Sequence, residues 1–327
     1  MAARAWRAAA SAWDEVASGA LAFGAADAAR VALESMGECL RRDDDPAGAA
    51  VALERAAALD PSGGAPTAVV RLVAVWAEVG RLDVAAAAGA AALERTADPF
   101  GRLLLADTLV SVHLSRGDVV AAQAAFDVLD GVATGSARVA AELRAGQLAT
   151  VRGALPEAVA VLERVLRQVA GSPAGRAGVL AELATVDGFR GAHDQAAARW
   201  REVIAAATEA GRASLVWSAR ASLTRALAAS GVPSLPGALD DGLSWARSRQ
   251  LRPLEVELLA ARGAATGAPE AWRLGEALAR ACGMRWWAGF CLASVAADHA
   301  ERADAAALLA GHVPWSAGFA GGHGVRR

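Results

Sequence analysis

The hydrophobic pattern of the chain repeats at nearly constant intervals. Each repeat consists of a helical stretch, a short turn, an alanine five residues after the turn and, in most units, a bulky apolar residue four positions later. β-branched residues are scattered and do not alternate with polar ones, so the pattern favours helices over strands. The turns are spaced by 36 to 38 residues, and a sixth is expected after 40 more. They fall at Asp44, Gly80, Gly117, Gly153, Gly191 and Gly231.

Each interval has room for two helices of about 13 residues, which is an ordinary helix length. A helix that short is marginal in water, so it must be held by packing against its neighbours. Glycine at the turn supplies the positive φ that ends the first helix. The alanine after the turn marks a close approach of the two helices, as at Ala122 and Ala158. We therefore predict an all-α chain of stacked helix pairs.

The units resemble the tetratricopeptide (TPR) repeat, which reads W-x2-L-G-x2-Y, A-x3-F, A and P. The resemblance covers residues 28–250, and Gly89 stands where the second unit should carry a bulky residue. It implies a right-handed α-solenoid of about six hairpins with helical caps. The first unit matches best, at Leu33, Met36, Gly37, Leu40, Ala49, Leu53, Ala56 and Pro61, and the fourth matches at Gly146, Ala158 and Leu162.

The pattern divides the chain into four parts. Residues 1–27 are expected to form an N-terminal capping helix, and residues 28–250 the TPR-like array. Residues 251–310 read as degenerate repeats or a C-terminal helical cap. The glycine-rich tail, residues 311–327, has no helical periodicity and is expected to be disordered.

The resemblance also implies a function and a binding face. In such arrays the first helix of each pair lines a concave groove that holds a partner peptide or helix. We expect a non-catalytic scaffold or sensor module that binds a protein or peptide. The chain contains no lysine and mixes acids among the arginines, which argues against a clamp for a partner's C-terminal carboxylate. The polar residues expected to face the groove are Glu34, Glu38, Arg41, Arg71, Glu78, Asp107, Arg116, Arg144, Gln147, Glu182 and Arg225.

Charge and composition narrow the choice of partners and compartment. The chain has 33 basic and 35 acidic residues, so nothing calls for a nucleic-acid or anionic-membrane partner. Lys, Asn and Tyr are absent, which is typical of a GC-rich bacterial genome. No stretch has the length of a signal peptide's apolar core or of a membrane span, and we expect a cytoplasmic protein. The sequence leaves the oligomeric state open.

Candidate chemistry is sparse, and we expect no cofactor, no metal and no catalytic residue. Cys39, Cys282 and Cys291 lack the spacing of a disulfide framework or a zinc site. His113 occupies a packed position of a first helix. His312 and His323 could bind metal only adventitiously.

Two alternative functions stay open. The acidic run Asp43–Asp45, with Asp240 and Asp241, resembles the carboxylates of an all-α isoprenoid-type lyase, although Asp is also an ordinary N-cap residue in such a turn. The chain could instead be a ligand-sensing module of a bacterial transcription regulator. The run Arg285–Trp287 is either a core seam or a binding surface.

Overall fold

The computed structural model describes residues 2–59, 66–232 and 237–314, and every regular element in these ranges is a helix. The helices are α1 (Ala2–Ala22), α2 (Ala26–Arg42), α3 (Pro46–Ala58), α4 (Pro66–Glu78), α5 (Leu82–Arg95), α6 (Pro99–Arg116), α7 (Val119–Val132), α8 (Ala137–Val151), α9 (Leu155–Gln168), α10 (Pro173–Phe189), α11 (His193–Glu209), α12 (Ala213–Ala229), α13 (Gly237–Ser248), α14 (Arg252–Thr266), α15 (Pro269–Ala281), α16 (Arg285–Ala293) and α17 (His299–Leu309). The prediction of an all-α chain is confirmed.

The helix ends follow local sequence signals. Side chains of Asp45, Asp98, Asp118 and Ser172 each accept a hydrogen bond from the backbone N–H three residues on, which satisfies one free donor at the helix start. The predicted turns all take a left-handed backbone, with φ between 54° at Asp44 and 81° at Gly80. Because these conformations end one helix and redirect the chain, they determine where each pair folds back on itself.

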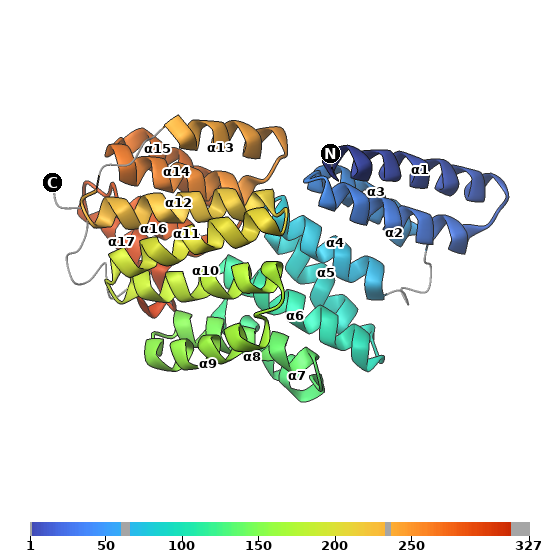
Figure 1. Cartoon of the computed structure of the whole chain (residues 1–327), viewed down its shortest axis with the longest axis horizontal. Helices are drawn as coiled ribbons and strands as arrows, with labels where there is room; N and C mark the ends of the chain where they lie inside the picture. Colours follow the sequence, from blue (N-terminus) through green and yellow to red (C-terminus); the bar gives the residue numbers. More distant parts are fainter. Residues whose placement is uncertain (1, 60–65, 233–236, 315–327) are drawn as a thin grey trace.

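Successive helices pack as antiparallel pairs, from α2 with α3 to α16 with α17, and the pairs stack in chain order (Figure 1). The exception is α13, which packs more on α14 than on α12. We call the even-numbered helices α2 to α16 the first helices of their hairpins. Neighbouring first helices, such as α4 and α6 or α12 and α14, touch one another more than neighbouring second helices do. The first helices therefore line the inner side of the curve. This arrangement is a TPR-like α-solenoid, as the sequence pattern predicts.

The close contacts within hairpins explain the alanine and glycine positions. Ala49, Ala85, Ala122, Ala158 and Ala196 are all buried between the helices of their hairpins. Glycines on the facing helices leave space for a bulky side chain, and they do so in two different arrangements.

In the first and fourth hairpins, a Cβ at Gly37 or Gly146 would lie 2.8 Å from Leu53 or Leu162 of the second helix. In the second hairpin the arrangement is inverted. Gly89 lies on the second helix and makes room for Leu109 of the next hairpin, whose Cδ2 would be 2.7 Å from an added Cβ. The absence of a bulky residue at position 89 is thus compensated from α6.

The two ends of the array differ from its middle. Helix α1 packs along α2. At the other end, α14 with α15 and α16 with α17 form two further hairpins in the stretch 251–310. Residues 311–314 follow α17, and His312 there is buried with only 4% exposure. The remaining tail, residues 315–327, lies outside the described residues.

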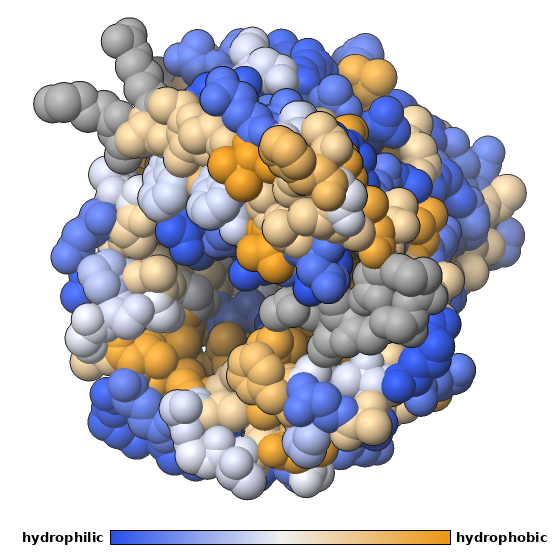
Figure 2. Space-filling view, turned by 90° about the vertical axis from the view of Figure 1, so that its right-hand side faces the viewer, coloured by the Kyte–Doolittle hydropathy of each residue, from blue (hydrophilic) through white to orange (hydrophobic). Residues whose placement is uncertain are grey.

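The C-terminal hairpins turn back onto the early ones, so that the sixth, seventh and eighth hairpins lie on the turns of the first, second and third. We call this closed turn of the solenoid the ring. One apolar cluster joins Val73 and Val112 from α4 and α6 to Val256, Met284 and Ala288 near or within α14 and α16. Further along, the guanidinium of Arg249 donates to the backbone carbonyls of Asp43 and Asp44, at 2.6 and 3.2 Å. Seen from the right-hand side of Figure 1, the surface of the molecule is hollowed (Figure 2).

Candidate functional site

Polar side chains on the first helices meet across hairpins because the repeat places them side by side. Residues 35 to 37 apart occupy equivalent positions on adjacent first helices. Arg41 of α2 donates to Glu78 of α4 at 3.1 Å. Arg144 of α8 forms two hydrogen bonds to the carboxylate of Asp107 on α6, at 2.8 and 3.1 Å. Side chains predicted separately on each helix therefore form pairs.

The pairing continues across three hairpins. The Arg144 guanidinium also donates to the amide oxygen of Gln147 at 3.0 Å, and the Gln147 amide donates to Glu182 of α10 at 2.7 Å. These six residues, Arg41, Glu78, Asp107, Arg144, Gln147 and Glu182, are called the inner row below. Charged hydrogen bonds of this kind hold neighbouring hairpins at a defined angle. Any partner on this face must fit around them or exchange with them.

The other predicted residues of the first two hairpins are Glu34, Glu38 and Arg71, and each has a partner on α2 or α4. Glu34 is buried and accepts from Arg30 on its own helix at 2.5 Å, while Arg71 of α4 donates to the Glu34 backbone carbonyl at 3.4 Å. Glu38 accepts from Arg42 at 2.9 Å. These contacts tie α2 to itself and to α4.

A second polar group lies on α12 and α14. Arg225 donates to the Ser222 hydroxyl at 2.9 Å and to the backbone carbonyl of Glu257 at 3.3 Å. Its guanidinium also lies 4.8 Å from the ring centroid of Trp287 on α16, within range of a cation–π contact. Ser218 donates to the Glu257 carboxylate. We call Ser218, Arg225, Glu257 and Trp287 the α12–α16 group.

Sequence reasoning predicted Arg225 in this group but not Glu257 or Ser218. The signal was present, because Ser218 and Glu257 are 39 residues apart, close to the repeat period. Continuing the repeat spacing beyond residue 250 would have placed Glu257 opposite Ser218. Trp287 belongs to the unusual run Arg285–Trp287, and the structure places its ring against Arg225.

Burial sets the acidity of the inner carboxyls. It raises the pKa of Glu78, Glu182 and Glu257 above the ordinary value for glutamate. The hydrogen bond from Gln147 to Glu182 and the charge of Arg41 near Glu78 act in the opposite direction but do not cancel the effect. Burial likewise lowers the pKa of Arg225. The inner face therefore holds charges that are costly to keep ionised.

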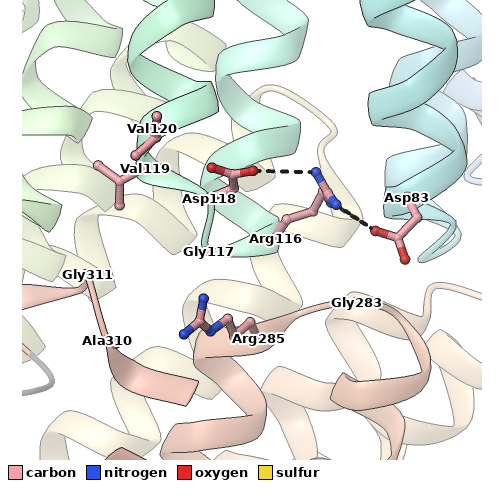
Figure 3. A pocket seen from close by; sticks show the side chains of 10 residues that line it. All are labelled: Asp83, Arg116, Gly117, Asp118, Val119, Val120, Gly283, Arg285, Ala310 and Gly311. Atoms are coloured by element: carbon pink, nitrogen blue, oxygen red, sulfur yellow. Dashed lines mark hydrogen bonds and ion pairs between the residues drawn. The ribbon is translucent and has the colours of Figure 1, made fainter. Parts of the chain in front are cut away.

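Arg116 lies outside the inner row, at the seam between the early turns and the C-terminal hairpins. Its guanidinium bridges Asp83 at 2.9 Å and Asp118 at 3.8 Å. A hollow of about 500 Å³ lies beside it, lined by Gly117 to Val120 on one side and by Gly283, Arg285 and Gly311 on the other (Figure 3). The predicted groove residue is thus a seam residue.

The acidic run has local partners. Asp45 caps α3, and Asp43 and Asp45 both pair with Arg7 of α1, at 2.7 and 3.3 Å. Asp240 pairs with Arg262 at 3.1 Å. In the described part of the chain, no three His, Cys, Asp or Glu residues gather as they would around a metal ion.

The three cysteines and His113 are buried in the core. Cys39, Cys282 and Cys291 are free thiols, and burial raises the pKa of Cys291 to about 12. Within the described residues, His113 Nδ1 is a buried atom with no hydrogen-bond partner.

None of the helices in residues 2–59, 66–232 and 237–314 combines the length and hydrophobicity needed to cross a membrane.

Comparison with known proteins finds similar shapes only. No family model matches the sequence, and no curated protein does. Among solved structures, the chain is similar to a tetratricopeptide repeat protein from Parabacteroides merdae ATCC 43184, with 12% identity over 84% of this chain and 98% of that one, and a TM-score of 0.46. It is also similar to yeast Tom70, with 13% identity over 96% of this chain and 60% of that one, and a TM-score of 0.48. The fold assignment therefore depends on the helix pairs and turns of this chain.

Proposed function

We propose that the chain is a non-catalytic protein-binding module that holds a peptide or helix of a partner along the inner face of the first helices. The observation that carries this proposal is the inner row itself. Its charged and amide side chains come from five first helices, α2 to α10, and pair across adjacent hairpins, Arg41 with Glu78, Asp107 with Arg144, and Gln147 with Glu182. A face of this kind suits an elongated partner better than a compact small molecule.

The chemistry of the row indicates what the partner carries. Both signs of charge are present, and each buried carboxyl costs free energy to keep ionised. A basic side chain of the partner placed near Glu182 or Glu257 would lower that cost, and an acidic one near Arg225 would find unused N–H donors. We therefore expect a segment of mixed charge, whose apolar side chains supply most of the affinity and whose charges set its register.

The proposal is tested by placing a photo-cross-linking amino acid at Gln147. The matched control carries it at Glu163, an exposed residue of the second helix α9. If the inner face binds the partner, a protein cross-links to position 147 and not to position 163. Identical products from both positions, or none from position 147, would contradict the proposal.

A second measurement then uses the captured segment as a synthetic peptide. Arg144→Gln removes the bidentate pair with Asp107, whereas Arg164→Gln removes a pair with Glu142 on the outer side, at 3.2 Å. We expect Arg144→Gln to weaken binding by about tenfold, since charged hydrogen bonds contribute more than neutral ones, and Arg164→Gln to leave it unchanged. Equal effects of the two variants would argue against the inner face.

A further inference from the structure

The closure of the ring ends in a short segment after α17, and its contacts differ from those of the rest of the seam. The ring of His312 lies edge-on between Trp286 of α16 and Phe189 at the end of α10, with centroids 4.5 and 5.3 Å away. The next residue, Val313, occupies the space beside the turn at Gly153, where a Cβ would lie 2.7 Å from Val313 Cγ1. Residues 310–314 thus connect the last hairpin to the fourth and fifth.

The middle of the seam is built differently. There α4 and α6 share one apolar cluster with α14 and α16, and Cys282 packs directly on Gly80. Such a cluster is a continuous part of the core, and its opening would expose buried apolar surface from several helices. We expect this part of the ring to stay closed as long as the array is folded.

Between that cluster and the segment after α17 the seam contains a space of about 500 Å³ beside Arg116 and Arg285 (Figure 3). Around this space Trp286 packs on Gly117, and a Cβ at Gly311 would lie 3.7 Å from Val119 Cγ2. Arg285 crosses to the end of α17, donating to the Ala307 carbonyl at 2.5 Å, and Trp286 Nε1 donates to the Ala310 carbonyl at 3.4 Å. The hydrogen bond of Arg285 and the side chain of Val313 are exposed, and exposed contacts of this kind are a feature of regions that open locally.

We propose that residues 310–314 are a latch, which releases from Trp286, Phe189 and Gly153 and lets the ring open from its C-terminal end while the apolar cluster stays intact. The latch gates entry to the inner row. With the latch closed, an extended peptide must thread through the ring, whereas an open latch admits a preformed helix from the side. This last consequence rests on the proposed function, but release of the latch does not.

Two turn glycines provide a matched pair of variants for the full-length chain. Gly153 and Gly191 have nearly the same backbone, with φ of 78° and 76°. An alanine at either position meets the same unfavourable left-handed conformation. The Cβ at 153 would also collide with Val313, whereas no described residue has an atom within 4 Å of the Cβ at 191. Any difference in hydrogen exchange between Gly153→Ala and Gly191→Ala is therefore caused by the contact between position 153 and Val313.

Hydrogen exchange measured by mass spectrometry follows the opening without any partner. In the wild type, we expect amides of residues 299–313 to exchange faster than those of α11 and by a route that is insensitive to low denaturant. Gly153→Ala should accelerate exchange at 299–313 by about tenfold, because the displaced Val313 no longer seats the segment, while Gly191→Ala leaves it unchanged. Adding Val313→Ala to Gly153→Ala should restore most of the slow rate, because it removes the Cγ1 atom that clashes with the new Cβ and lets His312 keep its place between Trp286 and Phe189.

Three results would overturn the latch. The first is that residues 299–313 exchange only together with α11, which means that the seam opens only on global unfolding. The second is the same acceleration in both alanine variants, which assigns the effect to backbone strain alone. The third is that Val313→Ala fails to restore the rate. Because no partner is present in these measurements, their outcome tests the latch independently of the binding experiments, which test the proposed function.

Discussion

The turns of hairpins two to four and those of hairpins five and six look alike in sequence but have different surroundings. Gly80, Gly117 and Gly153 each receive a side chain from the C-terminal segment, namely Cys282, Trp286 and Val313. Gly191 and Gly231 also have positive φ, but among the described residues nothing lies within 4 Å of an added Cβ at either position. The first set of glycines is needed both for the turn and for the close approach, whereas the second set is needed for the turn alone.

Inside the hairpins the two regions should behave identically, which gives the largest expected effect. Ala158 of the fourth hairpin and Ala196 of the fifth are 0% and 1% exposed. Replacing either by tryptophan forces the two helices apart, at a cost of at least about 3 kcal/mol. We predict that Ala158→Trp and Ala196→Trp unfold their surroundings equally, measured by denaturant titration followed by circular dichroism. A fully stable variant would contradict the assigned helix contacts.

At the turns the two regions should separate, with a smaller effect. Gly191→Ala should cost about 1 kcal/mol, from the left-handed backbone alone. Gly80→Ala adds a clash, because its Cβ would lie 2.7 Å from Cys282 Sγ and 3.3 Å from Arg252 Cβ. Since Cys282 is fixed in the apolar cluster, we expect roughly 1 to 3 kcal/mol more. Thermal melts of both variants, side by side, measure the difference. Equal losses of stability would show that the C-terminal segment does not rest on this turn.

The smallest expected effect is a pH dependence at the latch. Burial lowers the pKa of His312 to about 4, from an ordinary value of 6.5. The closed latch therefore excludes the proton that the released segment would take up, so its stability is complete above pH 6.5 and declines as the pH falls toward 4. We predict that exchange at residues 299–313 accelerates by roughly tenfold between pH 7 and pH 5, after correction for intrinsic exchange rates.

The control for this measurement is His312→Gln. Buried carboxyls such as Glu182 and Glu257 have raised pKa values, so their protonation in acid stabilises the folded chain and opposes the histidine in any global measurement. Those groups are the same in both proteins. The acid sensitivity should therefore be present in the wild type and absent in His312→Gln. The same sensitivity in both would assign it to other groups.

The sequence predicted the parts of the fold that depend on local signals. The turns at glycine or aspartate were predictable because each needs a residue that accepts a left-handed backbone. The buried alanines were predictable because each close contact between two helices needs a small side chain. Counting along first helices also singled out Arg41, Glu78, Asp107 and Arg144, whose role in binding a partner stays a prediction. Their pairing follows only when residues one repeat period apart are compared. Glu257 was missed because the units after residue 250 were not phased, whereas Trp287 belonged to a run that the sequence left open as either a core seam or a binding surface.

The ring closure was beyond reach of the sequence. Whether Arg249 meets Asp44 depends on small rotations between hairpins that accumulate over more than two hundred residues, and no single residue encodes them. The same limitation misplaced Arg116, which was expected in the groove but lies at the seam. A residue near the end of a first helix can face either the groove or the returning segment, and only the closed ring distinguishes the two.

The closure of the ring is tested most directly by a disulfide between position 80 and the natural thiol of Cys282. A Cβ at position 80 would lie 3.3 Å from the Cys282 Cβ, close to the separation that a disulfide requires. We predict that Gly80→Cys, under mild oxidation, joins to Cys282 across 202 residues of chain, giving faster migration on a non-reducing gel and a linked peptide pair by mass spectrometry. Gly191→Cys should form no such link. If Gly80→Cys stays reduced under conditions that oxidise an exposed thiol pair, the array is open and the account of a closed ring is wrong.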